Sequence, residues 1–228
     1  MTCMQWFEFP DAPASAAALA ATVAQRLSAA LARDDRAVLA VSGGKSPVPF
    51  FHALRSQPLD WSRVDITLVD ERFVPADHPD SNAALVREHL LQDAAAAARF
   101  LPLVGAARDD VAELAAANAA YQQPTVAVLG MGEDGHTASL FPGAAALADG
   151  LDMSRTLPLL AVQPLTAPHL RFSMSKAALL ACDSLILSIQ GAGKRQVFDQ
   201  AVQGINDSLP ISHFLLQTEC PIDVYWTA

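Results

Sequence analysis

Short runs of aliphatic and β-branched residues alternate along this chain with longer stretches of helical periodicity. The short runs are dense in Val, Leu and Ile instead of alternating with polar residues, which is typical of strands buried on both faces. This order predicts an α/β fold, with a Rossmann-like, mostly parallel sheet and helices on both of its faces. The predicted strands are Arg36–Val41, Val64–Val69, Thr125–Leu129, Leu185–Ile189 and Asp223–Trp226, with Gln5–Phe9 as an edge strand.

The first helix is predicted from Pro13 to Ala32. Asp11 can accept hydrogen bonds from the N–H groups of its first turn, and Pro13 suits that turn because a proline needs no donor there. Aliphatic residues recur at every fourth position from 19 to 31 and give the helix one apolar stripe. Further helices are predicted after Pro47, Ser81, Asp109, Ser175 and Gly193.

Length and composition narrow the protein class. The 228 residues fit a single domain, 1–228, and 52% hydrophobic residues with 17% charged residues predict a globular core. No apolar run approaches the roughly 20 residues of a membrane helix, and the first ten residues do not read as a signal peptide. The net charge of −9 argues against a nucleic-acid partner, although it does not exclude a small anionic ligand.

Cysteine usage predicts a reducing compartment. Cys3, Cys182 and Cys220 are far apart, odd in number and without the spacing of a zinc site. We therefore expect three reduced thiols and a cytoplasmic protein. The sequence leaves open whether the chain is a monomer or a small homo-oligomer.

The first informative turn is Ser42-Gly43-Gly44-Lys45-Ser46-Pro47, which joins a predicted strand to a predicted helix. Two glycines allow the backbone to bend tightly and to approach a ligand, and Ser46 adds a hydroxyl beside the N–H groups of a helix start. A Walker nucleotide loop is excluded because Leu39 occupies the position of its first glycine. The turn indicates either phosphate binding or a tight connection without a ligand.

A second turn, Asp70-Glu71-Arg72, follows a buried strand directly. Three charges at such a place are unfavourable unless they are paired or functional. Arg72 can pair with a carboxylate for stability alone, or its planar fork of donors can hold a substrate oxygen or phosphate. Ser81-Asn82, further along, is most simply a helix cap.

The third turn runs from Gly130 to His136 and formally contains the GxGxxG pattern. A dinucleotide site is not expected, because Glu133 and Asp134 would repel a pyrophosphate and Pro142 comes too early for a long helix. Histidine titrates near neutral pH, and a neighbouring carboxylate can orient it and raise its basicity. Asp134 and His136 therefore predict a pair that activates water, unless His136 only completes a loop hydrogen bond.

Two cations follow late in the chain. Arg171 precedes a predicted helix, and Lys194 lies in a glycine-rich turn after a predicted strand. A lysine near a helix start opposes the helix dipole unless an anion binds there, so Lys194 is a candidate anion contact. Either residue could instead be a solvated charge. The remaining histidines have no comparable context and are expected to be surface or structural: His52, His78, His89, His169 and His213.

The motifs described above, taken together, resemble those of the 6-phosphogluconolactonase family. The matching motifs are SGGKSP at 42–47, DERFVP at 70–75 with SN at 81–82, LGMGEDGHTASLFPG at 129–143 and GAGK at 191–194. The resemblance implies the fold shared with glucosamine-6-phosphate deaminases and hydrolysis of 6-phospho-D-glucono-1,5-lactone, with no cofactor or metal. Ser46 stands where the family usually has threonine and keeps the hydroxyl, whereas FSMSKAAL beside Arg171 is less regular than the family's form.

Residue by residue, the resemblance implies roles for nine positions. His136 would be the general base with Asp134 beside it, and Asp70 and Arg72 would lie near the sugar or its phosphate. No GxSxG elbow is present, so a serine nucleophile is not expected. The expected phosphate contacts are Gly43, Gly44, Ser46, Lys194 and Arg171.

Two other functions remain open at this stage. A glucosamine-6-phosphate deaminase or isomerase could use Asp70 as the base that removes a proton from a sugar carbon. That reaction also requires a carboxylate soon after His136, which helps to open the sugar ring. The segment Thr137–Pro142 contains none. A non-catalytic sugar-phosphate sensor would need a segment that binds DNA or a partner, and it would have no use for the Asp134–His136 pair.

Overall fold

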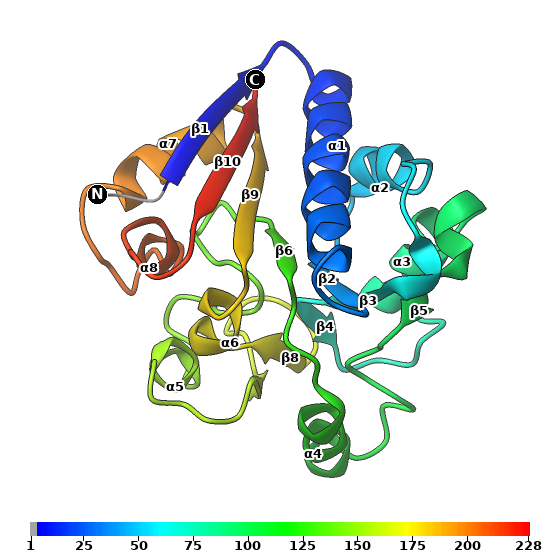
Figure 1. Cartoon of the computed structure of the whole chain (residues 1–228). Coiled ribbons are helices and arrows are strands. Elements are labelled where there is room, and N and C mark those ends of the chain that lie inside the picture. The colour runs from blue at the N-terminus through cyan, green and yellow to red at the C-terminus, as the bar shows by residue number, and fades with distance from the viewer. Residues whose placement is uncertain (1–3) are drawn as a thin grey trace.

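The computed structural model describes residues 4–228. Seven strands form one sheet in the order β1-β10-β9-β6-β2-β3-β5, and every neighbouring pair is parallel (Figure 1). The strands are β1 (Met4–Phe9), β2 (Ala37–Val41), β3 (Val64–Leu68), β5 (Arg99–Phe100), β6 (Val126–Leu129), β9 (Ser184–Gln190) and β10 (Ile222–Thr227).

The predicted strands are confirmed, with ends that differ by one residue. All residues of β2, β3 and β6 are buried, as their unbroken aliphatic runs predict. β1 lies at one edge of the sheet, where Gln5–Phe9 was expected. β5 at the other edge was not predicted, because two residues carry no periodicity.

The predicted helices are also present, and Asp11 Oδ1 accepts a hydrogen bond from the Ala14 amide at the start of the first one. α7 begins at Ala192, two residues before the predicted start. Two short helices, α5 and α8, were not predicted. The helices are α1 (Ala12–Leu31), α2 (Val48–Leu54), α3 (Asn82–His89), α4 (Asp110–Ala120), α5 (Leu147–Leu151), α6 (Lys176–Leu180), α7 (Ala192–Ala201) and α8 (Ser212–Leu215).

Helices cover both faces of the sheet, which confirms the predicted architecture. The connections from β2 to β3 and from β9 to β10 run in opposite directions across the sheet. Because such crossovers are right-handed, their helices fall on opposite faces. Figure 1 accordingly shows α1 and α2 on one side and α7 and α8 on the other.

A second, antiparallel sheet of three strands was not predicted. It contains β4 (Asp70–Arg72), β8 (Arg171–Met174) and β7 (Leu159–Val162), in that order. The sequence analysis placed Asp70-Glu71-Arg72 in a turn, which is wrong because these residues form β4. It placed Arg171 ahead of a helix, and α6 does follow, but the strand β8 that carries Arg171 was missed. Val69 is the junction: its N–H bonds to the parallel sheet, and its carbonyl accepts from Met174 in β8.

The sheet has a topological switch point between β2 and β6. These neighbouring strands lead away to opposite sides, β2 to β3 and β6 to β9, so the segments after them diverge. Such a divergence leaves a crevice beyond the carboxyl ends of the strands, where α/β proteins bind ligands. The Ser42 hydroxyl ties the floor of this crevice by donating to the Val128 carbonyl and accepting from the Gly130 amide.

Two expectations from the composition concern membrane helices and reduced cysteines. Within residues 4–228, no helix is both long enough and apolar enough to cross a bilayer. Cys182 is a free, buried thiol, and burial raises its pKa. Cys3 lies outside the described residues.

Candidate active site

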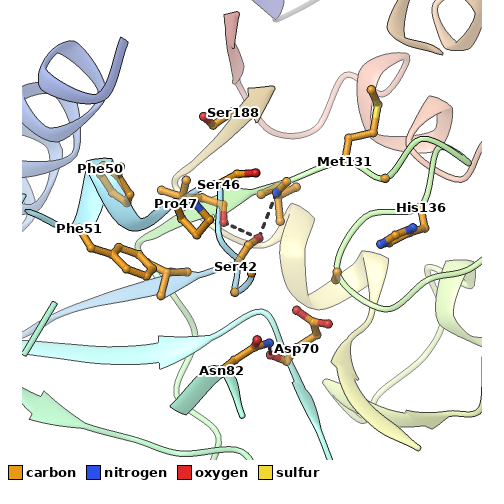
Figure 2. A pocket seen from close by; sticks show the side chains of 18 of the residues that line it. Ser42, Ser46, Pro47, Phe50, Phe51, Asp70, Asn82, Met131, His136 and Ser188 are labelled. Atoms are coloured by element: carbon orange, nitrogen blue, oxygen red, sulfur yellow. Dashed lines mark hydrogen bonds between the residues drawn. The ribbon is translucent and has the colours of Figure 1, made fainter. Parts of the chain in front are cut away.

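A cavity of about 280 Å³ opens at the switch point (Figure 2). It receives side chains from both sheets and from the turns after β2, β6 and β9. Eight of the nine predicted site residues line it, namely Gly43, Gly44, Ser46, Asp70, Arg72, His136, Arg171 and Lys194. The ninth, Asp134, contacts the cavity through His136.

The glycine turn after β2 is shaped by its neighbours. A Cβ on Gly43 would lie 1.9 Å from Asn82 Oδ1, so only glycine lets this buried amide pack against the turn. Gly44 has φ +86°, in the left-handed region that glycine adopts without strain. Ser46 is exposed, lies in the turn before α2 and lines the cavity.

Asn82 is a cavity residue whose position the sequence did not indicate. Ser81 caps α3 as expected, because its hydroxyl accepts from the Ala84 amide at 3.1 Å. Asn82 instead points back to the sheet, where its Nδ2 donates to the Asp70 carbonyl at 2.9 Å. Its side chain therefore joins the first and second turns of the sequence into one wall.

Glu71 explains how charges at the end of β3 are accommodated. Its buried carboxylate accepts hydrogen bonds from the amides of Arg72, Asn82 and Ala83, at 2.7–2.8 Å, and from the Ser81 hydroxyl. Burial raises the pKa of Glu71 despite these bonds. Glu71 fixes the start of α3 against β4, a structural role that the sequence analysis did not assign.

Arg72 and Arg171 bring two guanidinium groups to the cavity. Arg72 donates to the Asp80 carbonyl at 2.5 Å, and Arg171 Nη1 lies 3.9 Å from Asp70 Oδ2. Arg171 is 8% exposed, and no hydrogen bond holds its guanidinium within residues 4–228. Burial is the main cause that lowers its pKa, and the Asp70 carboxylate only partly opposes this. A buried guanidinium with free donors is prepared for an anion.

Lys194 contributes a third cation. It lies in the first turn of α7, after β9, and lines the cavity. Burial lowers its pKa, and the charge of Glu133 partly offsets that effect. Within the part of the chain that the structure describes, no ion pair holds its ammonium group, which leaves it available to a ligand.

His136 and Asp134 form the expected pair at the mouth of the cavity. His136 Nδ1 lies 2.5 Å from Asp134 Oδ1, and the imidazole stacks on Phe141 with a centroid distance of 4.1 Å. With the carboxylate accepting from Nδ1–H, the other ring nitrogen, Nε2, carries the lone pair. A Cβ on Gly132 would lie 2.2 Å from His136 Nδ1, so that glycine makes room for the pair.

Asp70 is the carboxylate that lines the cavity. Ser139 donates from its hydroxyl to Asp70 Oδ2 at 2.5 Å, and its own amide donates to the Ser173 hydroxyl. Figure 2 shows the Asp70 carboxylate and the His136 imidazole directed into the same space. Asp70 is therefore oriented by a hydroxyl and lies within reach of the same ligand as His136.

Phe141 links the imidazole to the cations. Its ring stacks on His136 and also lies under the Arg171 guanidinium, 5.1 Å from ring centroid to Cζ. One aromatic side chain thus fixes the spacing between the imidazole and a cation, a role that the sequence analysis did not assign. A phenylalanine within the motif carries no signal of this contact, because Arg171 lies in β8, in a separate segment of the chain.

The family follows from comparison with known proteins. The model of the family described as glucosamine-6-phosphate isomerases/6-phosphogluconolactonase matches residues 10–226. The chain belongs to this family. The match covers residues 10–226, which include every residue that lines the cavity.

Two curated relatives of this family member are 6-phosphogluconolactonases. That of Pseudomonas putida is 48% identical over 227 residues, which cover 96% of this chain and 91% of the relative. That of Neisseria meningitidis serogroup A is 47% identical over 214 residues, which cover 91% and 92%. The matches therefore extend over nearly the whole length of both proteins.

Solved structures agree on the architecture of this family member. A 6-phosphogluconolactonase from Shewanella baltica is 38% identical with a TM-score of 0.95, covering 99% of this chain and 98% of its own. A monomeric glucosamine-6-phosphate deaminase is 16% identical with a TM-score of 0.76, covering 98% and 97%. The second likeness shows that the fold is shared with the deaminases, as the sequence motifs implied.

Proposed function

We propose that this chain hydrolyses 6-phospho-D-glucono-1,5-lactone to 6-phospho-D-gluconate, a step of the oxidative pentose phosphate pathway. One observation carries the proposal: three cations and an imidazole–carboxylate pair open into one cavity. The names of the relatives support the same substrate. One domain spanning 1–228 performs the reaction in the cytoplasm, as a monomer or a small homo-oligomer and without a nucleic-acid partner.

The phosphate binds at the cationic end of the cavity. Arg171 and Lys194 neutralise it, and the backbone of Gly43 and Gly44 with the Ser46 hydroxyl surrounds its oxygens. Arg72 lies in the same wall and reaches the sugar or the phosphate. This anchor is remote from the bond that breaks, so it positions the lactone without taking part in the chemistry.

His136 acts as the general base. Asp134 holds its Nδ1–H, so Nε2 accepts a proton from a water molecule as the water oxygen bonds to C1 of the lactone. The carbonyl oxygen becomes an oxyanion, which a backbone N–H or a cation of the cavity stabilises. The bond between C1 and the ring oxygen then breaks, the protonated imidazole donates to that oxygen, and the acid formed releases its proton.

The experiment is a rapid assay of lactone disappearance, corrected for spontaneous hydrolysis. His136→Ala is expected to fold normally and to lose about 10²–10⁴-fold in kcat. His213→Ala is the matched control, because His213 also pairs with an aspartate, Asp207, at 2.8 Å, but outside the cavity. A near-normal kcat in the His136 variant would remove His136 from this role.

The deaminase alternative is tested with glucosamine 6-phosphate in the same preparation. Asp70 is well held for proton transfer at carbon, but among the described residues no second carboxylate lines the cavity to help open a sugar ring. We expect no release of ammonia. A sugar-phosphate sensor would bind 6-phosphogluconate and leave the lactone unchanged. Turnover of the lactone would therefore exclude the sensor function, and binding without turnover would support it.

A further inference from the structure

Three side chains that the proposed reaction does not use meet beside the cavity. His78 and Asp80 lie in the segment after β4, and His169 lies two residues before β8. A nitrogen from each histidine and an oxygen from Asp80 fall within 4.8 Å of one another, and no other such group occurs in residues 4–228. This group could not be recognised in the sequence, because 89 residues separate Asp80 from His169.

The spacing of these atoms is close to that of a metal site. His169 Nε2 lies 3.0 Å from Asp80 Oδ2, and His78 Nδ1 lies 4.0 Å from the same oxygen. Ligands at about 2.0–2.1 Å from a tetrahedral zinc ion are separated by roughly 3.3 Å, a value between these two distances. Small side-chain rotations therefore suffice to bring the three atoms onto one ion.

His78 is already an acceptor at the nitrogen concerned. The backbone N–H of Asp80 donates to His78 Nδ1 at 3.1 Å, so this nitrogen carries a lone pair. An ion would take the place of that hydrogen. The Asp80 residue is exposed, and water can then accept from the released N–H.

The backbone holds His169 in an unusual conformation. Its φ is +69°, in the left-handed region that a non-glycine residue seldom adopts and that persists only where neighbours enforce it. The next residue, Leu170, accepts a hydrogen bond from the Phe73 amide at 2.7 Å. This contact keeps the imidazole of His169 against the segment that carries His78 and Asp80.

We propose that His78, Asp80 and His169 bind a divalent transition-metal ion such as Zn²⁺, with the ion's remaining positions open to water. Two imidazoles and one carboxylate suit zinc, cobalt or nickel and do not suit Mg²⁺ or Ca²⁺, which prefer oxygen ligands. The three side chains are 28–51% exposed, so an ion can enter without unfolding the chain.

The ion would join two segments that carry the cavity's arginines. Arg72 donates to the Asp80 carbonyl, and Arg171 follows His169 by two residues. Occupancy is therefore expected to change KM for the lactone more than kcat. This consequence rests on the proposed function, whereas binding of the ion does not.

The test is calorimetric titration of chelator-treated protein with Zn²⁺ alone. The wild type is expected to bind one ion per chain, and His169→Ala and Asp80→Asn are each expected to weaken binding at least about tenfold. His78→Gln lies in an exposed segment and repeats the test if another variant folds poorly. Co²⁺ in place of Zn²⁺ should give visible absorption bands that the same variants lose.

Two control variants separate this site from other histidine pairs. His52→Ala removes the His52–His89 contact of 3.2 Å, and His136→Ala removes the base; both should bind Zn²⁺ like the wild type. Absence of saturable binding, unchanged affinity in His169→Ala, or loss of binding only in a control variant would overturn the site. Turnover is assayed separately, so an inactive chain that binds Zn²⁺ would contradict only the proposed function.

Discussion

Arg72 and Arg171 stand directly opposite each other in the antiparallel pairing of β4 and β8, and both line the cavity. Like charges at facing positions destabilise a pair of strands. The Nε atoms of both residues are buried without a partner in the described part of the chain, and the Asp70 carboxylate is 3.9 Å from Arg171. A phosphate group would supply acceptors to Arg171 and to the Arg72 donors that the Asp80 carbonyl does not engage.

The first prediction replaces Arg171 with methionine. Loss of one charge-assisted hydrogen bond, which contributes about 1.5–3 kcal/mol, should raise KM for the lactone roughly 10–100-fold. The thermal midpoint should not fall, because an apolar side chain of similar length replaces a buried charge without a close partner. Steady-state kinetics and thermal unfolding measure the two effects.

A ligand control accompanies this variant. Inorganic phosphate should raise the unfolding temperature of the wild type by mass action and raise that of Arg171→Met far less. Arg33→Met, which removes an exposed arginine paired with Asp183, should behave like the wild type toward phosphate. An unchanged KM in Arg171→Met would refute the phosphate contact.

The parallel sheet could be predicted from the sequence because its strands are buried on both faces and read as unbroken aliphatic runs. The antiparallel sheet could not, since β4 has three residues and all of them are charged. Parallel strands end at one edge, so motifs after β2, β6 and β9 were expected to converge. The supporting side chains, Asn82 and Phe141, act through contacts between distant segments and give no local signal.

The second prediction concerns Gly132. A Cβ here would lie 2.2 Å from His136 Nδ1 and 2.5 Å from Asp134 Oδ1, so alanine must displace the pair. We expect Gly132→Ala to lower kcat at least about tenfold, because misplacing a catalytic group by ~1 Å is sufficient for such a loss. Gly204→Ala is the control, since its Cβ would meet nothing within 4 Å. A wild-type kcat in Gly132→Ala would show that the pair does not need this position.

The third prediction is the stability of Glu71→Gln. Glu71 Oε1 accepts from the amides of Arg72 and Asn82, and Oε2 accepts from the Ala83 amide and the Ser81 hydroxyl. In glutamine an NH₂ group replaces one of these oxygens and faces its donors, so the variant should lose about 1–3 kcal/mol of unfolding free energy. Urea unfolding measures this loss. An unchanged unfolding free energy in Glu71→Gln would show that the role assigned to the carboxylate is wrong.

The same variant gives a pH dependence with a definite sign. Burial raises the pKa of Glu71 above its ordinary value of 4.5, so the folded chain holds this proton to a higher pH than the unfolded chain. The resulting stability is complete below the unfolded pKa and is lost as pH rises through the folded pKa. Because glutamine does not titrate, the difference in unfolding free energy between wild type and variant should narrow as pH rises above the ordinary value of 4.5. If the difference in unfolding free energy widens as pH rises, the pKa of Glu71 is lowered in the folded chain and not raised.

The last prediction separates Lys194 from the chemistry. Its ammonium lines the cavity without an ion pair among residues 4–228, so Lys194→Ala should raise KM and leave kcat nearly unchanged. Burial lowers the pKa of Lys194, so the wild type should lose this charge, and affinity for the lactone phosphate, at a lower pH than an ordinary lysine. Lys176→Ala is the control, because Lys176 begins α6 and does not line the cavity. If Lys194→Ala lowers kcat at unchanged KM, the ammonium acts on the reacting carbonyl, and the phosphate is held by the arginines and the glycine turn alone.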